Sequence, residues 1–214
     1  MSSNPYEVIR PSRGASLQEG KAYHDIPGVE GPSYRSGSAA RSVQIATAVT
    51  VDKKTGLDLG CSVGGVSFGL ATMGATMHGF DLDGSAVAVG QQHAINSGLP
   101  VILNTADLTD ASTVDAILIP GMYDFCVWLA NWMWIATDGG YDYACNMLRK
   151  VSDVIPVLFF ETAQASGSQA GNHGINSVQD VIDLVRSNTT YSSVVDLGES
   201  ADGWHGRNLL KCSR

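Results

Sequence analysis

Positively charged side chains are scarce in this sequence. Its 214 residues include 13 Lys and Arg against 21 Asp and Glu, which gives a formal net charge of -8 at pH 7. Nucleic acids and anionic membranes bind basic surfaces, and this chain has too few basic residues to build a large one. We therefore expect a small-molecule partner, with neither a nucleic acid nor a membrane.

Cysteines and long apolar runs are also few. The four cysteines lie far apart and form no Cys-x-x-Cys pair, which argues against a structural zinc site, so no metal is expected. No run approaches the ~18 apolar residues of a membrane span. The polar N-terminus lacks the apolar core of a secretory signal, so we expect a cytoplasmic protein with reduced thiols.

Glycine, in contrast, is abundant, with 24 residues of 214, where about 7% is typical. The length predicts one globular domain with an appendage. Residues 1–37 are rich in Ser, Gly, Pro and Tyr without periodicity, and we expect an irregular N-terminal lid or lead-in there. Residues 38–214 are expected to form the domain.

Short strands and helices alternate through the expected domain. The pattern predicts strands at residues 55–60, 75–81, 100–104, 123–129, 157–160, 193–197 and 207–212. It predicts helices at residues 38–50, 64–73, 85–96 and 141–151, and one behind a Ser177 cap with Val178, Val181, Ile182 and Val185 on one face. Such alternation indicates an α/β fold with a parallel sheet, in which ligands bind at the carboxyl ends of the strands.

Two of these helices have an expected apolar face. Ala39, Val43 and Ala46 recur at helical spacing in the first helix, and Val87, Ala94 and Ile95 are expected on one face of the third. We expect both faces to pack inward.

The segment LDLGCSVGG, residues 57–65, leaves one strand and opens a helix. A phosphate-binding P-loop would need lysine where Val66 stands. The dinucleotide fingerprint would need glycine where Ser62 stands, and Asp58 would repel a pyrophosphate. The sequence therefore favours a ligand that carries an amine.

This segment resembles the first motif of class I S-adenosylmethionine (SAM) dependent methyltransferases, a strand ending in acidic-x-Gly-x-Gly-x-Gly, with Ser62 at the middle glycine. The resemblance covers about residues 38–214. It implies a Rossmann-like three-layer sandwich, with a seven-stranded, mostly parallel sheet whose last strand is antiparallel. It also implies SAM as cofactor, with Asp58 near the methionine amino group and the backbone of Gly60, Ser62 and Gly64 close to the ligand.

Two further acids fit the resemblance. Asp81, which ends the second strand of the domain 21 residues after Gly60, is expected to accept both ribose hydroxyl protons, with Leu82 beside it. Asp107 is expected at the adenine amino group and Leu108 on the ring, although Asp107 could simply cap a turn. Asp83 is expected to cap the following helix.

Two arginines before and within the first core helix, Arg35 and Arg41, are candidates for binding the cofactor carboxylate. Ordinary solvated arginines are the alternative.

The methyl acceptor is expected near Asn131 and Trp132, which follow the strand that borders the sulfonium in the family. Base-methylating relatives carry a tetrad with two prolines there, and its absence argues against a nucleic-acid amine. Trp132 could floor the acceptor pocket, whereas Trp128 and Trp134 are read as core residues.

An oxygen nucleophile would need a base, and three residues at strand ends are candidates. These are His173, His205 and Glu161. His78 and His93 lie in regular elements and are expected to be structural.

These observations predict a SAM-dependent methyltransferase that acts on a small molecule, most simply at oxygen. Methylation of tRNA or another macromolecule is one alternative. A catalytically silent SAM-binding partner subunit is another, which the serine at position 62 would permit.

Overall fold

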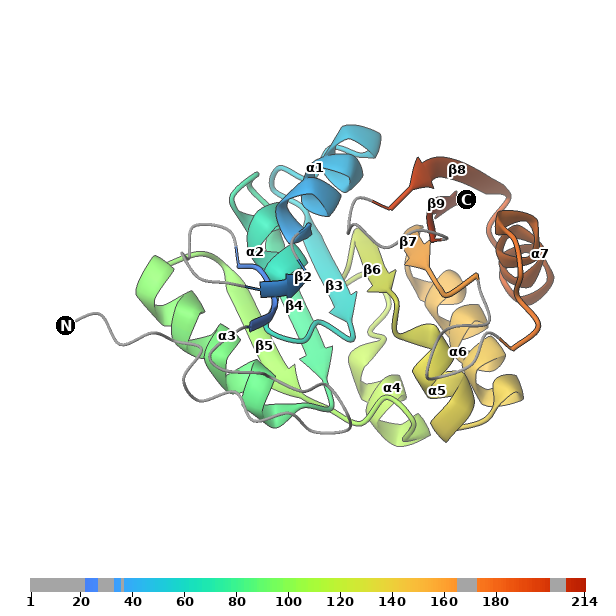
Figure 1. The fold of residues 1–214 in the computed structure, drawn as a ribbon, viewed down its shortest axis with the longest axis horizontal. Coiled ribbons are helices and arrows are strands. Elements are labelled where there is room, and N and C mark those ends of the chain that lie inside the picture. Colours follow the sequence, from blue (N-terminus) through green and yellow to red (C-terminus); the bar gives the residue numbers. More distant parts are fainter. Residues whose placement is uncertain (1–21, 27–32, 36, 165–172, 201–206) are drawn as a thin grey trace. The chain divides into compact units, whose positions relative to one another are not determined.

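A computed structural model describes residues 22–26, 33–35, 37–164, 173–200 and 207–214 (Figure 1). Its strands are β1 (Ala22–His24), β2 (Ser33–Arg35), β3 (Thr55–Leu59), β4 (Thr76–Asp81), β5 (Val101–Thr105), β6 (Phe125–Leu129), β7 (Val157–Glu161), β8 (Ser193–Glu199) and β9 (Asn208–Ser213). Its helices are α1 (Ser38–Ala48), α2 (Gly65–Ala71), α3 (Gly84–Ser97), α4 (Ala111–Ile117), α5 (Trp132–Asp138), α6 (Tyr141–Val154) and α7 (Val178–Asn188).

Seven strands form one sheet in the order β5-β4-β3-β6-β7-β9-β8. The pairs β4/β5, β3/β6 and β6/β7 are parallel. The last strand, β9, is antiparallel to both β7 and β8. The expected Rossmann-like α/β sheet, mostly parallel with an antiparallel last strand, is confirmed.

The chain divides into two compact units. Unit 1 comprises residues 1–54, 61–106 and 201–203, and unit 2 comprises residues 55–60, 107–200 and 204–214. Residues on both sides of the expected boundary at 37/38 fall in unit 1, so that boundary stays a prediction. We describe each unit by itself.

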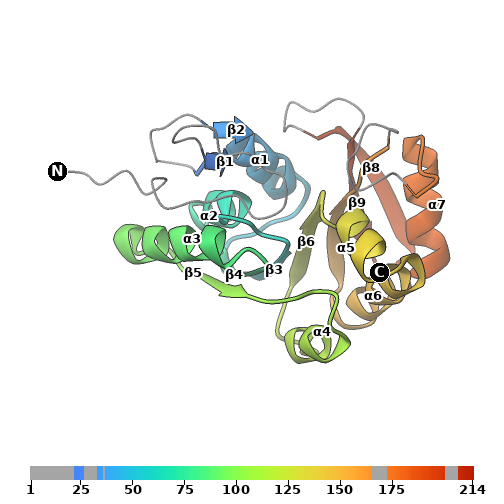
Figure 2. The same ribbon diagram turned by 60° about the horizontal axis from the view of Figure 1, so that its bottom comes forward.

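In unit 1, α1 packs against α2, and α2 and α3 pack against β4 and β5 (Figure 2). The N-terminal segment is less irregular than expected, because β1 and β2 form a short parallel pair.

The α1 helix buries a different face from the expected one. Val43 is 54% exposed, whereas Ser38, Arg41, Ser42 and Ile45 are buried. The reason is close contact with α2: Ser42 Oγ lies 3.1 Å from the Val66 carbonyl oxygen, which small side chains permit.

The prediction that Val87, Ala94 and Ile95 of α3 all pack inward is also wrong in part. Val87 is buried, but Ile95 is 75% exposed. The Asp83 cap is confirmed, since its carboxylate accepts from the N–H groups of Ser85 and Ala86.

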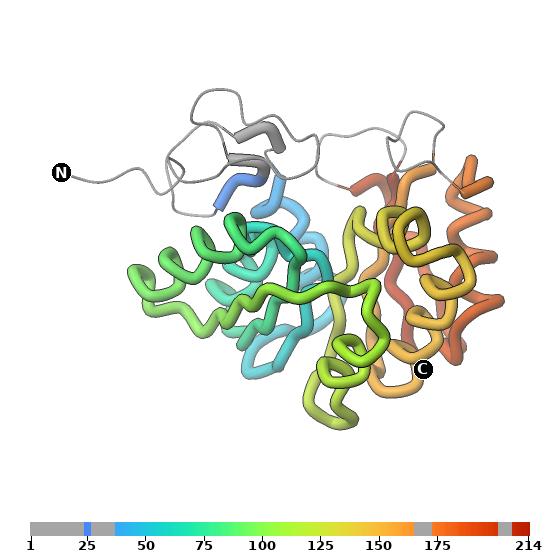
Figure 3. Tube along the Cα trace, turned by 90° about the horizontal axis from the view of Figure 1, so that it is seen from below, coloured from blue at the N-terminus to red at the C-terminus, as the bar shows by residue number. Residues whose placement is uncertain are grey.

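In unit 2, α5 packs on α6, and α6 also packs on α7 and β7 (Figures 2 and 3). Helices α4 and α5 were not predicted, whereas the equally short α2 was, because the glycine loop before α2 marks its start. The cap of α7 is confirmed: Ser177 and Asp180 form a reciprocal capping box.

All four cysteines are described and buried, and none forms a disulfide: Cys61, Cys126, Cys145 and Cys212. No helix within the described ranges has both the length and the apolar character needed to cross a membrane.

Candidate cofactor site

The glycine loop after β3 is built on left-handed backbone. Gly60 has φ 78, Ser62 has φ 52 and Gly64 has φ 81. This conformation is free of strain for glycine but costs other residues roughly 1–2 kcal/mol. The left-handed backbone at position 62 favours glycine, which is the residue in the motif that this segment resembles. Ser62 adopts the same turn, but with backbone strain.

Neighbouring groups crowd the glycines of this loop. In unit 2, a Cβ atom on Gly60 would lie 2.5 Å from Cγ of Asn131. In unit 1, a Cβ atom on Gly65 would lie 2.5 Å from both the Asp25 carbonyl oxygen and Ser38 Oγ. Any side chain at these positions would displace its neighbours.

Asp81, in unit 1, fastens the loop to the end of β4. Its Oδ2 accepts the Ser62 N–H over 2.8 Å, and its Oδ1 accepts the Asp83 N–H over 2.9 Å. Burial raises the pKa of the Asp81 carboxyl; the two backbone hydrogen bonds oppose this, and the nearby Asp83 charge adds to it. Each oxygen can accept a further hydrogen bond, so the group fits a ligand with adjacent hydroxyls.

Leu82, directly after Asp81, is exposed although it is apolar. The expected place of Leu82 beside the cofactor stays a prediction.

Asp58, in unit 2, is 5% exposed near the carboxyl end of β3. Burial, and to a smaller extent the Asp58 charge, raise the pKa of the Cys126 thiol well above its ordinary value. A carboxylate in this position suits a positively charged ligand group.

Asp107 and Leu108, also in unit 2, lie between β5 and α4. Asp107 Oδ1 accepts from both the backbone N–H and the hydroxyl of Thr109, at 2.8 Å and 2.7 Å. Asp107 therefore caps a turn, which was the alternative to the adenine role. Leu108 is buried, and its carbonyl accepts from Tyr143 Oη. Their roles at adenine stay predictions.

Arg41, in unit 1, is buried on α1, which contradicts the alternative of a solvated arginine. Arg35 is described only as the last residue of β2. Sequence reasoning missed Asp25, whose Oδ1 accepts from the N–H groups of Gly37 and Ser38 at the start of α1. No local pattern indicates this cap, because 12 residues separate Asp25 from Gly37.

Trp132 does not floor a pocket in this structure, which corrects the expectation. The side chain is fully buried, its Nε1–H donates to the Ala144 carbonyl over 3.2 Å, and its ring packs edge-on against Phe160. Trp128 is buried as expected, but Trp134 is 38% exposed and is not a core residue. The tryptophan next to Asn131 is therefore part of the core of unit 2.

Glu161 is not an acid at a pocket edge, a second correction. The side chain is 0% exposed, Oε2 accepts from Ser200 Oγ over 2.5 Å, and Oε1 lies 3.5 Å from Nη1 of the buried Arg207. A buried carboxylate requires such a countercharge, so Glu161 is committed to the ion pair.

His173, in unit 2, contacts α5. Its Nε2 lies 3.0 Å from Thr137 Oγ1 and 3.2 Å from the Met133 carbonyl oxygen. Because the Thr137 hydroxyl already donates to Met133, Nε2 must carry the proton in these contacts, and Nδ1 is the basic nitrogen of the neutral ring. His205 lies outside the described residues.

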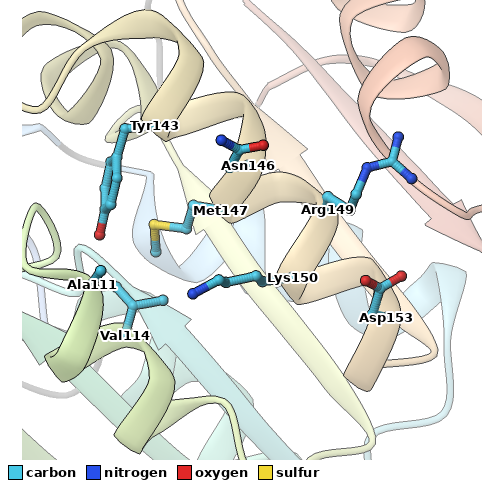
Figure 4. Close-up of a pocket in the computed structure, with 8 residues that line it drawn as sticks. All are labelled: Ala111, Val114, Tyr143, Asn146, Met147, Arg149, Lys150 and Asp153. Carbon is cyan, nitrogen blue, oxygen red and sulfur yellow. The ribbon is translucent and has the colours of Figure 1, made fainter.

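Two hollows in unit 2 were not predicted. One, of about 370 Å³, lies where Tyr143, Met147 and Lys150 of α6 point toward Ala111 and Val114 of α4 (Figure 4). The other, of about 270 Å³, has His173 in its wall. Among the described residues, no group of His, Cys, Asp and Glu is placed to hold a metal ion.

Several solved structures have a fold similar to that of this chain. No protein-family model matches this sequence, and no curated protein matches it. WbdD, described as a bifunctional kinase-methyltransferase, superposes with a TM-score of 0.71 at 18% identity over 92% of this chain and 44% of its own. This chain thus spans less than half the length of WbdD.

Two other structures match over most of both chains. Magnesium protoporphyrin IX methyltransferase (ChlM) from Synechocystis PCC 6803, with bound SAH, superposes with a TM-score of 0.60 at 16% identity over 83% of this chain and 81% of its own. The [4+2]-cyclase SpnF superposes with a TM-score of 0.61 at 14% identity over 82% and 80%. Identities this low show the fold alone, and the chain has the Rossmann-like fold of class I methyltransferases.

Proposed function

We propose that this chain is a SAM-dependent methyltransferase that acts on a small molecule, with oxygen as the nucleophile. The observation that carries the proposal is the Asp81 carboxylate, which clasps the glycine loop through Ser62 N–H and keeps acceptor capacity on both oxygens. Asp81 would hold the two ribose hydroxyls. Asp58 would face the amino group, and the left-handed turn would let the ligand approach the backbone.

The cofactor supplies a methyl group on a positively charged sulfur, so the protein's task is alignment, exclusion of water and removal of one proton. Glu161 is unsuited to the last role because Arg207 and Ser200 already engage it. We therefore propose His173, through Nδ1, or His205 as the base.

A small acceptor agrees with the net charge of -8, which disfavours tRNA and other polyanions. A second candidate function is a SAM-binding protein without methyl transfer. Two observations support this second function: the backbone strain at Ser62, and the likeness to a structure described as a [4+2]-cyclase.

Calorimetry with SAM and with its demethylated product, S-adenosylhomocysteine (SAH), tests the cofactor. We expect micromolar binding of at least one, and binding of neither would refute the proposal. Assays with methyl-labelled SAM and phenol, carboxylate, sugar and tRNA acceptors then separate the functions. Transfer to a small oxygen acceptor supports the proposal, transfer to tRNA alone supports the macromolecular alternative, and binding without transfer supports the silent subunit.

A further inference from the structure

The hollow between α4 and α6 lies within unit 2, and none of its lining residues has a part in the proposed function. Its volume of about 370 Å³ is in the range of small-molecule sites. Its floor is apolar, because Val114 of α4 and Met147 of α6 are both only 2% exposed. Ala111, one turn before Val114, is too small to fill the space that Figure 4 shows in front of Met147. The hollow can therefore receive an apolar group.

Two polar contacts join α6 to the chain at α4, and they start from residues two turns apart on α6. Tyr143 Oη donates to the Leu108 carbonyl, shortly before α4, over 3.0 Å. Lys150 forms an ion pair with Asp115 of α4. Between these contacts the α4 side chains that face α6 are small, so the two helices are joined without filling the space between them.

The rim of the hollow is more positive than the chain as a whole, which has a net charge of -8. The charged residues among the described lining residues are Arg149, Lys150 and Asp153, two cations against one anion. Figure 4 shows the Lys150 side chain directed toward Val114, with Arg149 and Asp153 farther from the floor. The positive group nearest the apolar floor is thus the Lys150 ammonium.

The ion pair with Asp115 does not withhold Lys150 from a ligand. The two side chains are 44% and 61% exposed. Exposed ion pairs contribute little to stability, so a carboxylate from a ligand can replace that of Asp115 at little cost. The ring of Tyr143 provides a side wall on which an apolar or aromatic group can pack.

We infer that the hollow between α4 and α6 binds a small amphipathic carboxylate. Its apolar body contacts Val114, Met147 and the Tyr143 ring, and its carboxylate pairs with Lys150. This site is separate from the candidate cofactor site, so the inference does not depend on the proposed function.

The test is a methyl NMR titration of the full chain, labelled with 13C at the valine and methionine methyl groups. The three probes share a phenyl ring and a four-carbon chain and differ in charge: 4-phenylbutanoate, 4-phenylbutan-1-ol and 4-phenylbutylamine. We expect the acid to bind about 5-fold more tightly than the alcohol, and the amine to bind most weakly. The largest shifts are expected at the methyl groups of Val114 and Met147.

Three variants assign the binding to the hollow. Lys150→Met should lower the affinity for the acid about 5-fold, to that of the alcohol, and leave the affinity for the alcohol unchanged. Arg186→Met removes a positive charge from α7, outside the hollow, and is the matched control that should leave all three affinities unchanged. Ala111→Leu should fill the hollow and abolish binding of all three probes, which gives a second readout if the methionine variant does not fold.

Equal affinity for the three probes, or no binding of the acid by the wild type, would overturn the inference. An unchanged preference for the acid in Lys150→Met would overturn it too. So would displacement of the acid by SAH, because this would place the acid in the cofactor site. Failure of the wild type to bind SAM or SAH would refute the proposed function alone, so the two failures are distinguishable.

Discussion

The backbone N–H of Ser62 donates to Asp81 Oδ2 over 2.8 Å while Ser62 itself is held at φ 52. One hydrogen bond thus joins a strained loop residue to the acid that ends β4. The two residues have separable roles, since the loop strain belongs to Ser62 and the ligand chemistry to Asp81.

Ser62→Gly should leave the free energy of unfolding unchanged or raise it by up to about 1 kcal/mol, because relief of left-handed strain exceeds the added entropy of the unfolded chain. Ser62→Val should lower it by about 1–2 kcal/mol, because a β-branched residue tolerates this conformation poorly. Urea denaturation measures both. A valine variant as stable as the glycine variant would mean that the loop is not strained.

Asp81→Asn should weaken binding of SAM or SAH by about 1.5–3 kcal/mol, the range for hydrogen bonds to a charged group. Asp83→Ala is the matched control, since it removes the α3 cap at a cost of about 1 kcal/mol in stability and should leave affinity unchanged. If Asp81→Asn binds as the wild type does, Asp81 does not hold the ribose.

The same carboxyl predicts a pH dependence. Burial raises the pKa of Asp81 above its ordinary 3.8 in the folded state, so the native protein binds the proton more tightly than the unfolded chain. Its contribution to stability is therefore present below pH 3.8 and is lost as pH rises through the raised pKa. The stability of Asp81→Asn relative to the wild type should accordingly increase over that window, as denaturation at a series of pH values would reveal.

Arg207→Met should cost about 3–5 kcal/mol in stability, because it leaves the fully buried Glu161 without its countercharge. The double variant with Glu161→Gln should recover much of that loss. Lys150→Met, which breaks the exposed ion pair with Asp115, is the control and should cost less than about 1 kcal/mol. Equal losses for the two single variants would show that burial does not decide the strength of these pairs.

His173→Gln separates anchoring from catalysis, because the glutamine amide can donate to Met133 as Nε2 does but cannot act as a base. If His173 is the base, kcat should fall by about 10²–10⁴ while SAH affinity and the melting temperature stay near wild type. His205→Gln should be measured in parallel. Full activity in both variants would exclude His173 and His205 as the base.

The sequence was sufficient for features that are local. The seven strands of the large sheet, the glycine turn, the Ser177 cap and the Asp83 cap follow from neighbouring residues and appear close to where they were expected. Features that depend on distant partners were missed or misread. Glu161 looked available because its partner Arg207 is 46 residues away, and the inward face of α1 depends on contact with α2.

In the candidate cofactor site, too, local features could be predicted and contacts between distant residues could not. The positions of Asp58, Gly60 and Asp81 could be anticipated from the motif, whereas nothing in the sequence indicates that Asn131 lies against Gly60 instead of capping α5. Helices α4 and α5 were missed for a different reason: seven residues complete barely two turns, and neither helix follows a motif such as the glycine loop that marks the start of the equally short α2.

The burial of all four thiols makes them internal reporters of opening. Burial raises the pKa of Cys126, Cys145 and Cys212, the last to about 12, so few reactive thiolates exist near neutral pH in the native protein. Cys61 belongs to unit 1 and the other three to unit 2. Alkylation followed by peptide mass spectrometry would therefore time the opening of the glycine loop separately from that of the rest of the sheet.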